Sequence, residues 1–474
     1  MKNKTNLLWI FAFSFVIAPT DASAQGIPLL TTITNPAPAA NDYFGGAVAA
    51  VGGDRVLIGA YRDDLGTTDA GAAYLFNTGG ALRTTFTNPT PAANDAFGYS
   101  VAAVGADRVL IGAYADDRGA TDAGVAYLFD TNGLLLATFP NPAPAASDYF
   151  GYAVAAMGSD RALIGAPNDD RGTTDAGTAY LFSTNGTLLT TFTNPTPALK
   201  DYFGCAAAAV GADRVLVGAY EDDRGALDAG AAYLFSTNGL LLTTFTNPAT
   251  LLVGGERFGY AVAAVGLDRV LIGAIDATAG VISPGAAYLF NTNGVLLTTF
   301  TNPTPAGGDL FGYCVAAVGS DRVLIGAHSD NTGATDAGSA YWFSTNGVLL
   351  NTFTNPAPAA GDWFGCAVAA AEGAWLAIGA YLDDAGAANA GTVYLYALQS
   401  PAPPPLSVRC TTTNTVLVSW PKPADGWNLE CATELGAGAS VWTQIPPPYQ
   451  TNATDIFYVE PPPATNRFYR LHKP

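Results

Sequence analysis

Histidine is nearly absent from this sequence: among 474 residues there are only two, His328 and His472. Residues 27–399 contain just the first of them, so neither a histidine-based catalytic triad nor a histidine metal cluster can form there. Lysine and arginine are also scarce, 20 against 39 Asp and Glu, which gives a formal net charge of −19. Such a surface repels nucleic acid and anionic lipid. We therefore exclude a nucleic-acid partner and expect calcium or cationic partners to be favoured.

Long apolar runs are missing beyond the first 24 residues. At the N-terminus, Lys2 and Lys4 precede an apolar run over residues 7–18, and Ala22-Ser23-Ala24 follows it. This order is typical of a secretory signal peptide, here residues 1–24, and the run is too short for a comfortable transmembrane helix. The sequence therefore predicts a secreted or cell-surface protein with no transmembrane segment after signal removal, and we expect a monomer.

Cysteine is also rare, and its count is odd. Cys205, Cys314 and Cys366 follow Phe-Gly pairs, whereas Cys410 and Cys431 lie near the C-terminus. An odd count leaves at least one thiol unpaired in an exported chain. We interpret the first three as small buried hydrophobic residues. The last two either form a disulfide or do not, and the sequence does not decide this.

What the chain has in abundance is repetition. A Phe-Gly pair followed by an Ala-rich run and Asp-Arg-Val-Leu-Ile-Gly-Ala recurs every 53 residues, with one interval of 55. The pair begins at Phe44, Phe97, Phe150, Phe203, Phe258, Phe311 and Phe364. A period near 50 residues indicates a repeat architecture such as a solenoid or a propeller. Glycine and proline, 84 residues together, favour short strands and turns over helices.

Each unit contains four strand-like pieces. These are the Ala-rich run, Arg-Val-Leu-Ile-Gly-Ala, Ala-Tyr-Leu-Phe and Leu-Leu-Thr-Thr-Phe, each bounded by turn residues. Thr-Asn-Gly between the third and fourth pieces, as at Asn132-Gly133, is a strong signal for a β-hairpin. Four antiparallel strands repeated seven times predict an all-β, seven-bladed β-propeller over residues 27–399. The Ala-rich strand is predicted to be innermost, where only small side chains fit.

The phase of the copies explains the ends of the array. The last unit stops after its third strand, residues 392–397, and residues 29–35 supply a fourth strand that precedes the first unit. Placing this N-terminal strand on the outside of the last blade would close the ring and remove the exposed sheet edges.

The repeats resemble a known family. Phe150-Gly151 with Ala162-Leu163-Ile164-Gly165-Ala166-Pro167 and the following Ala179-Tyr180-Leu181-Phe182 are similar to the FG-GAP repeat, which occurs in the integrin α-chain propeller and in bacterial secreted proteins. The resemblance covers all seven units and implies a seven-bladed propeller. Integrin-like members carry a calcium loop between the first two strands. Here only a tight turn such as Gly53-Asp54-Arg55 is present, and one carboxylate cannot supply the six to eight oxygens that calcium prefers.

The C-terminal part has a different composition. Residues 400–406 are Pro-rich and predict a stiff linker. Residues 407–474 contain short strand-like segments, such as Val416–Pro421 and Arg467–Leu471, and predict a small β-sandwich. This tail resembles the fibronectin-III-like modules at the C-termini of bacterial secreted proteins.

The charged residues gather in the two long loops of each unit. The phrase Asp-Asp-x-Gly-x-x-Asp-Ala-Gly supplies candidate calcium ligands at Asp63, Asp64, Asp69, Asp116, Asp117, Asp122, Asp169, Asp170, Asp175, Asp222, Asp223 and Asp228. The loops between units add Asp42, Asp95, Asp148, Asp201, Asp309 and Asp362. Repelling carboxylates favour a bound cation. Asp and Gly are also good turn formers, so a purely structural role remains open.

Aromatic residues border the same long-loop end. The candidate ligand-binding rim comprises Tyr43, Tyr61, Tyr114, Tyr149, Tyr202, Tyr220, Trp363 and Tyr381. Such rings could stack on sugars or could wedge between blades. The first hypothesis is a binding or adhesion protein for an extracellular glycan or surface protein, with Ca²⁺ as a candidate cofactor. The alternative is a carboxylate-dependent polysaccharide hydrolase or lyase. Such an enzyme needs two carboxylates in unlike environments. The copies are nearly identical, so we expect no enzyme. A third is a structural or adhesive surface protein without a specific ligand.

Overall fold

The computed structural model describes residues 27–248, 254–277, 283–371 and 373–398, and shorter stretches of the C-terminal part. The latter are residues 404–411, 415–422, 427–433, 442–447, 449–452, 454–461 and 467–472. The predicted signal peptide and most of the predicted linker lie outside the described residues. The chain divides into two compact units, Met1–Leu398 and Gln399–Pro474. All regular elements of the described residues are β-strands, as predicted.

The described part of the first unit forms seven antiparallel sheets of four strands each. Six follow chain order from the inner to the outer strand. The first three are β2 (Phe44–Val51), β3 (Arg55–Ala60), β4 (Ala72–Asn77) and β5 (Leu82–Thr87); β6 (Phe97–Val104), β7 (Arg108–Ala113), β8 (Val125–Asp130) and β9 (Leu135–Pro140); and β10 (Ala153–Met157), β11 (Arg161–Ala166), β12 (Thr178–Ser183) and β13 (Leu188–Thr193). The next three are β14 (Ala206–Val210), β15 (Arg214–Ala219), β16 (Ala231–Ser236) and β17 (Leu241–Thr246); β18 (Phe258–Val265), β19 (Arg269–Ala274), β20 (Ala286–Asn291) and β21 (Leu296–Thr301); and β22 (Val315–Val318), β23 (Arg322–Ala327), β24 (Ser339–Ser344) and β25 (Leu349–Thr354).

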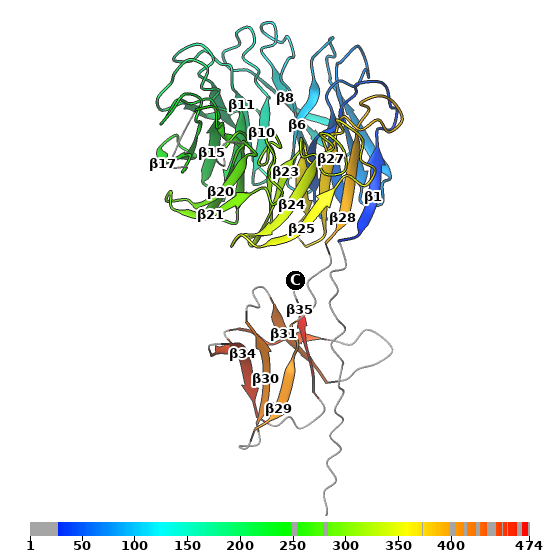
Figure 1. Ribbon diagram of the computed structural model, residues 1–474, viewed down its shortest axis with the longest axis vertical. Helices are drawn as coiled ribbons and strands as arrows, with labels where there is room; N and C mark the ends of the chain where they lie inside the picture. The colour runs from blue at the N-terminus through cyan, green and yellow to red at the C-terminus, as the bar shows by residue number, and fades with distance from the viewer. Residues whose placement is uncertain are drawn as a thin grey trace, which may run out of the picture. The chain divides into compact units, whose positions relative to one another are not determined.

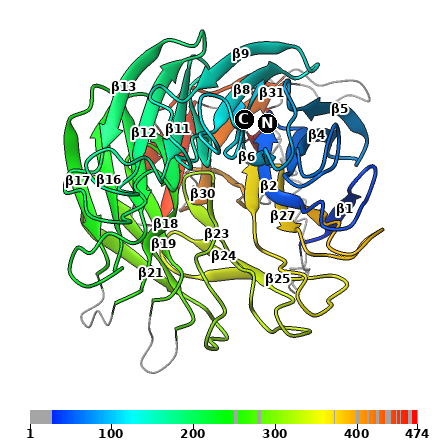
Figure 2. The same ribbon diagram turned by 90° about the horizontal axis from the view of Figure 1, so that it is seen from above.

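The seventh sheet joins the two ends of the array. It contains β26 (Val368–Ala371), β27 (Trp375–Ala380), β28 (Thr392–Ala397) and, on the outside, β1 (Leu29–Thr34). As the phase of the repeats predicts, β1 pairs antiparallel with β28, with Thr34 opposite Thr392 (Figure 1). Seen from above, the sheets are arranged around a central axis (Figure 2). The Ala-rich strands are innermost, so the unit is a β-propeller.

Burial follows the position of each strand in its sheet. The second and third strands, such as β7 and β8, are buried on both faces because neighbouring sheets cover them. One core cluster joins Leu110 and Leu128 of one sheet to Ile164 and Phe182 of the next. The outer strands expose most of their side chains and bury mainly the Phe of Thr-Thr-Phe, such as Phe192. Burial between sheets is therefore the main source of stability of this unit.

The glycines of the repeat allow adjacent sheets to approach closely. A Cβ at Gly59 of β3 would lie 1.9 Å from the carbonyl oxygen of Gly98, which follows Phe97 in the next sheet. The same contact occurs between the last and first sheets, where a Cβ at Gly379 would lie 2.1 Å from the Gly45 oxygen. Only glycine leaves room for this backbone contact.

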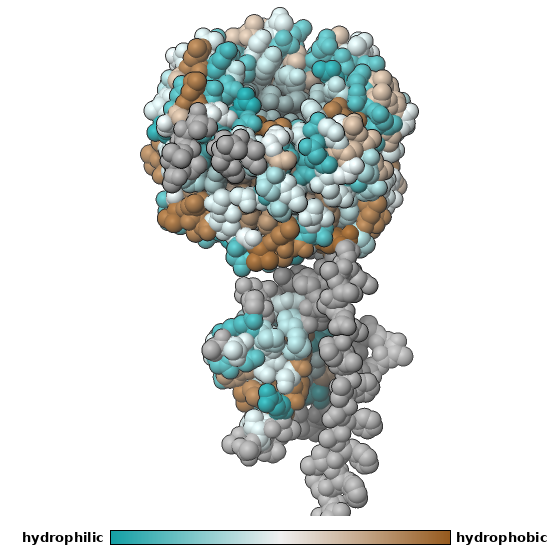
Figure 3. All heavy atoms as spheres, viewed as in Figure 1, coloured by the Kyte–Doolittle hydropathy of each residue, from teal (hydrophilic) through white to brown (hydrophobic). Residues whose placement is uncertain are grey.

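The two ends of the propeller differ in loop length and surface. Short turns such as Gly52–Asp54 lie at one end, and the loops that carry the Asp phrase lie at the other, called here the long-loop end. Exposed aliphatic side chains gather at the short-turn end, at the beginnings of the outer strands (Figure 3). They include Leu82, Leu135, Leu188, Leu241, Leu296 and Leu349. None of the described residues belongs to a helix that could span a membrane.

The second unit contains two sheets around one core. The first contains β29 (Ser407–Cys410), β30 (Val416–Pro421), β34 (Asp455–Glu460) and β33 (Gln450–Thr451); the second contains β32 (Thr443–Gln444), β31 (Asn428–Ala432) and β35 (Phe468–His472). Val418 and Trp420 of one sheet share a hydrophobic cluster with Leu429 and Leu471 of the other. Cys431 is a free thiol, whereas the side chain of its candidate partner Cys410 lies outside the described residues.

A tyrosine-lined axial cavity and its acidic loops

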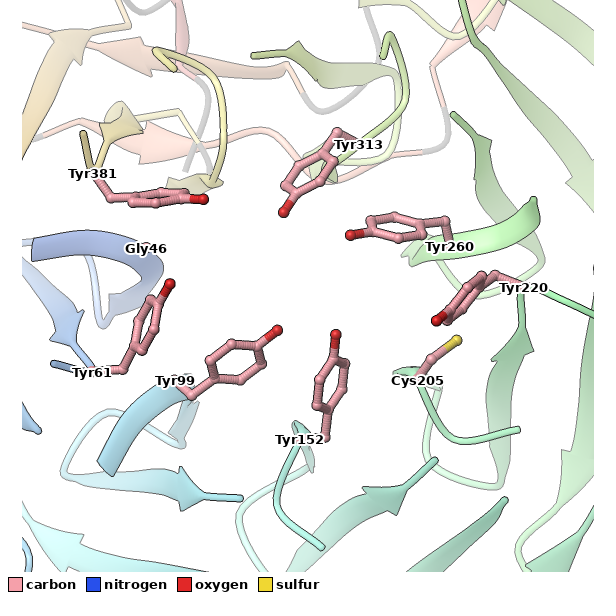
Figure 4. Close-up of a pocket in the computed structure, with 9 residues that line it drawn as sticks. All are labelled: Gly46, Tyr61, Tyr99, Tyr152, Cys205, Tyr220, Tyr260, Tyr313 and Tyr381. Atoms are coloured by element: carbon pink, nitrogen blue, oxygen red, sulfur yellow. The ribbon is translucent and has the colours of Figure 1, made fainter. Parts of the chain in front are cut away.

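A cavity of about 290 Å³ lies on the propeller axis at the long-loop end. We call it the axial cavity; it is lined by Gly46, Tyr61, Tyr99, Tyr152, Cys205, Tyr220, Tyr260, Tyr313 and Tyr381. The seven tyrosine hydroxyl groups point toward the same central space (Figure 4). These side chains come from several different sheets, so the cavity exists only when the sheets are assembled.

Two positions of the repeat supply these rings. Tyr99, Tyr152, Tyr260 and Tyr313 directly follow a Phe-Gly pair, near the start of an inner strand. Tyr61, Tyr220 and Tyr381 directly follow Gly-Ala, at the end of a second strand. Only the second group belongs to the rim predicted from the sequence. The first group was missed, although Tyr at four of seven equivalent positions next to the axis was a signal that could have identified it.

The other predicted rim residues surround the cavity as an outer layer. Tyr114 packs against Tyr99 and Tyr149, with ring centroids 4.5 and 5.1 Å apart. Tyr43 lies 5.3 Å from Tyr381, and further contacts join Tyr202 to Tyr220 and Trp363 to Tyr381. The rings therefore form an aromatic collar in which the inner members face the cavity and the outer members support them.

The cavity is electrically neutral at physiological pH. Burial raises the pKa of Tyr152 and Tyr313 far above the ordinary value of 10, so both phenols keep their protons. Burial also raises the pKa of the Cys205 thiol to about 12. The hydroxyl of Tyr99 interacts with that of Tyr152. The lining thus offers neutral hydroxyl donors and acceptors together with ring surfaces, and no formal charge.

The first Asp of each acidic phrase has a structural role in the described loops. The Tyr180 hydroxyl donates a hydrogen bond to Oδ2 of Asp169 at 2.7 Å, and the amide of Arg171 donates to Oδ1 at 2.9 Å. Asp169 is only 5% exposed. The same pair of contacts, tyrosine hydroxyl and backbone amide, occurs at Asp63, Asp116, Asp222, Asp330 and Asp383.

The second and third Asp shape the loop itself. The backbone amide of the third Asp donates a hydrogen bond of 2.9 Å to Oδ1 of the second, as from Asp69 to Asp64. The three following units have the same contact, in the pairs Asp117 and Asp122, Asp170 and Asp175, and Asp223 and Asp228. The third Asp has a positive φ of 52–54° in these four units. Asp tolerates this conformation better than most residues. The second Asp is exposed and the third half-buried.

The Asp of each loop between units is buried and bound to an asparagine. Asn141 Nδ2 donates to Oδ2 of Asp148 at 2.7 Å, and the amide of Ala145 donates to the same oxygen. Burial and the nearby charge of Asp169 raise the pKa of Asp148 to about 6, although the backbone hydrogen bond acts against this. Asp42, Asp95 and Asp201 have the same asparagine contact and the same pKa shift to about 6.

The geometry of the described acidic loops provides no cluster of metal-ligating side chains. Within the described residues, no group of three or more His, Cys, Asp or Glu side chains is placed to hold a metal ion. In three units an arginine side chain lies over the ring of the tyrosine that donates to the first Asp. Arg224 Nη2 donates to Thr196 Oγ1 at 2.7 Å, and the guanidinium lies 5.8 Å from the Tyr233 ring centre. Arg118 and Arg171 lie over the corresponding tyrosine rings.

Comparison with known proteins identifies the repeat and the fold. A family model described as FG-GAP repeat matches more than half of the chain, at residues 30–76, 84–129, 143–182, 192–235, 298–343 and 351–396. Among solved structures, the WD40 β-propeller domain of Doa1 is 13% identical, with a TM-score of 0.50. This match covers 79% of the present chain and 97% of that chain, and it shows the β-propeller fold.

A second solved structure is the β-propeller domain of the Trilobed protease from Pyrococcus furiosus. It is 10% identical, covers 74% of the present chain and 90% of that chain, and has a TM-score of 0.42. No curated protein sequence matches the chain.

Proposed function

Because the chain belongs to the FG-GAP repeat family, we propose that it is an extracellular binding or adhesion protein that binds a glycan at the long-loop end of its propeller. The observation that carries this proposal is the convergence of seven tyrosine hydroxyl groups in the axial cavity. Sugars present hydroxyl groups and apolar C–H faces together, and tyrosine complements both through its hydroxyl and its ring. A neutral lining suits a neutral sugar better than an anion or a small cation. The cavity volume is close to the lower end of the range for small-molecule pockets, about 300 Å³.

A protein partner is the second candidate for the same end. The aromatic collar extends beyond the cavity to the half-buried rings of Tyr43, Tyr149, Tyr202 and Trp363. Tyrosine and tryptophan are enriched at protein interfaces. The exposed second Asp of the acidic phrase, present in five units as at Asp117, adds negative charge at the same end. A partner with a basic surface would complement this charge.

Calcium binding in the acidic loops is kept as a separate proposal. Asp117 and Asp122 lie close enough for the charge of Asp117 to contribute to the raised pKa of Asp122, after burial. A cation would relieve this repulsion. A calcium-dependent rise in the unfolding midpoint that disappears in an Asp116→Asn/Asp117→Asn variant would support the site. An unchanged midpoint in calcium and in chelator would reject it.

The alternative function as a polysaccharide hydrolase or lyase would need an acid pair that a substrate can reach. Asp95 and Asp116 both contact Asn88 and are no more than 4% exposed, so the substrate could not reach them without loop movement. Cleavage of a polysaccharide that is abolished by exchanging one Asp pair would establish this alternative.

The finer architecture belongs to the proposal as well. We infer that the seven sheets form one closed seven-bladed ring, supported by the β1–β28 pairing and by the glycine contact between Gly379 and Gly45. We also propose that residues 1–24 are a secretory signal peptide and that the protein is secreted. We further propose that the C-terminal unit is a fibronectin-III-like module that serves in attachment. The two sheets around Trp420 are consistent with that small β-sandwich.

The proposed glycan binding is tested with the mature protein on a glycan array, followed by calorimetry of the glycans that bind. A Tyr99→Phe/Tyr152→Phe variant keeps the rings and removes two hydroxyl groups from the cavity. Each lost hydrogen bond costs about 1 kcal/mol, so the affinity should fall at least about tenfold. Leu240→Ser, at an exposed position of the short-turn end, is the control and should bind normally. Absence of any glycan binding by the unchanged protein would refute the proposal.

A further inference from the structure

A second cavity of about 230 Å³ adjoins the axial cavity. The two cavities share Tyr152, Cys205 and Tyr220 among their lining residues, so they lie side by side. The remaining wall of this side cavity consists of Tyr149, Pro167, Asn168 and Tyr202. All of these side chains are uncharged. Besides Tyr152, the side cavity is lined by three half-buried tyrosines of the collar, Tyr149, Tyr202 and Tyr220.

The side cavity has an identifiable cause in the sequence. Pro167 follows Gly-Ala in the third unit, where Tyr61, Tyr114, Tyr220 and Tyr381 occupy the same position of their units. In two units the tyrosine there contacts the ring before Phe-Gly of the next unit: Tyr114 lies 5.1 Å from Tyr149, and Tyr381 lies 5.3 Å from Tyr43.

In the third unit this aromatic contact is lost. Tyr202, the ring before Phe-Gly of the fourth unit, faces Pro167 instead of a tyrosine. Tyr202 instead stacks on Tyr220 of its own unit, with 5.2 Å between the ring centroids and 16° between the ring planes. The smaller proline therefore leaves open the space that a tyrosine ring fills in sister units.

We propose that the axial cavity and the side cavity are two adjoining subsites for an oligosaccharide of two or more sugar units. This inference rests on the proposed glycan binding and adds the length and direction of the ligand. One sugar unit occupies the axial cavity among the converging hydroxyl groups. The next unit leaves the axis between the third and fourth sheets, where Tyr149 and Tyr202 flank it and Pro167 forms the floor.

The chemistry of the side cavity fits a second sugar unit. Two phenol rings provide surfaces for the apolar face of a pyranose, and their hydroxyl groups together with the Asn168 amide provide neutral hydrogen-bond partners. The equivalent position holds a tyrosine ring in four units, His328 in the sixth and Ile275 in the fifth. Ile275 has no ring either, but it is only 4% exposed and lines neither cavity. The side cavity at Pro167 therefore gives the ligand an exit between the third and fourth sheets.

The test compares short and long ligands in a variant that closes the side cavity. Pro167→Tyr installs the residue of the sister units. The probes are glucose, galactose, mannose and N-acetylglucosamine, together with β-1,4-linked oligosaccharides of two and three units built from each. For the unchanged protein, we expect a disaccharide to bind at least about tenfold tighter than its monosaccharide, which corresponds to about 1.4 kcal/mol. In Pro167→Tyr this advantage should disappear while monosaccharide affinity is kept.

The control is Leu240→Ser at the short-turn end, where the side chain is 63% exposed. Leu240 lines neither cavity, so both affinities should stay unchanged. A second variant, Tyr202→Ala, removes one wall of the side cavity and should reduce oligosaccharide affinity more than monosaccharide affinity, since Tyr202 also stacks on Tyr220 of the axial cavity. Thermal unfolding shows whether Pro167→Tyr folds. If it does not fold, Tyr202→Ala still tests the inference.

The possible failures are distinguishable. Equal affinity for monosaccharides and oligosaccharides in the unchanged protein would overturn the two-subsite inference and leave glycan binding intact. An oligosaccharide advantage that survives both Pro167→Tyr and Tyr202→Ala would overturn it as well. If none of these saccharides and no glycan on the array binds the unchanged protein, the proposed function fails, and the inference fails with it.

Discussion

The indole nitrogen of Trp375 donates a hydrogen bond of 2.8 Å to the main-chain carbonyl oxygen of Gly53, which lies 322 positions earlier in the chain. Trp375 is the first residue of β27, and Gly53 belongs to the first short turn of the array. In other sheets an arginine at the equivalent position makes this contact with the next sheet, as Arg161 Nη2 does with the Ala212 oxygen at 2.7 Å. Trp375 therefore replaces the usual arginine at the junction of the last and first sheets.

This contact predicts a specific loss of stability at the junction. Trp375→Phe keeps an aromatic ring in the core but removes the N–H donor, and it leaves the Gly53 oxygen without this partner. The free energy of unfolding should fall by about 1–3 kcal/mol, from the lost hydrogen bond and the smaller ring. Urea unfolding measures this change.

The matched control is Arg161→Leu, which removes the equivalent hydrogen bond within the array from a partly exposed side chain. We expect a smaller effect there, because water can replace the arginine at the Ala212 carbonyl. Equal stability of Trp375→Phe and the unchanged protein would contradict the proposed role of this residue in joining the ring.

The N-terminal strand should matter through one buried side chain. Ile33 of β1 is 3% exposed and packs in the cluster that contains Trp375, Val393 and Leu395. Ile33→Ala should destabilise the propeller by about 2–5 kcal/mol because it leaves a cavity in this cluster. Leu30→Ala, at a side chain that is 46% exposed, should cost much less. Denaturant unfolding of both variants gives the comparison, and equal losses would show that β1 is not anchored through Ile33.

The acidic phrases give a third prediction, which separates their structural and functional interpretations. Tyr180→Phe removes the hydroxyl donor from the buried Asp169 carboxylate and should destabilise the protein by about 1–3 kcal/mol. Asp170→Asn changes the adjacent exposed carboxylate, keeps the Oδ1 acceptor, and should have little effect on stability without added calcium. Thermal unfolding checks both. A larger loss for Asp170→Asn than for Tyr180→Phe would contradict the assignment of the buried member as the structural one.

Much of the fold was predictable because the same sequence pattern occurs in seven successive units. The period, the four strand-like pieces and the Asn-Gly hairpins identify the sheets, and the surplus strand at residues 29–34 identifies its partner β28. Contacts between sheets were harder to predict. Tyr99 and Tyr152 lie 53 residues apart in sequence, yet their rings approach to 4.9 Å because both stand next to the axis. That proximity depends on the radius of the ring, which no pattern within one repeat records.

The acidic residues illustrate the same limit at the level of chemistry. The sequence shows Asp63, Asp64 and Asp69 as similar members of one phrase. In the structure Asp63 is buried and bound to Tyr74, whereas Asp64 is exposed and bonds a backbone amide. Loop geometry decides which carboxylate turns inward. Composition alone could therefore not separate a buried structural acid from an exposed candidate ligand.

The buried Asp residues of the loops between units predict an unusual pH dependence. The pKa of Asp42, Asp95, Asp148 and Asp201 is raised from 3.8 to about 6, chiefly because burial disfavours the charged form. The folded protein therefore takes up protons at a higher pH than the unfolded chain does. A state that binds more protons is stabilised as the pH falls. The free energy of unfolding should thus rise as the pH falls from about 7 toward about 4.

This dependence has the opposite sign to that of a carboxylate whose pKa is lowered by an ion pair, which loses stability in acid. Midpoints of thermal unfolding at pH 7.5 and pH 5 measure it directly, and the midpoint should be higher at pH 5. Asp148→Asn replaces one of the four carboxyls by a neutral amide and should reduce the difference between the two midpoints. Asp107→Asn, at an exposed Asp of a short turn, is the control and should leave the difference unchanged. A midpoint that falls between pH 7.5 and pH 5 would show that these buried acids keep their charge, held by the donors from Asn141 and its counterparts.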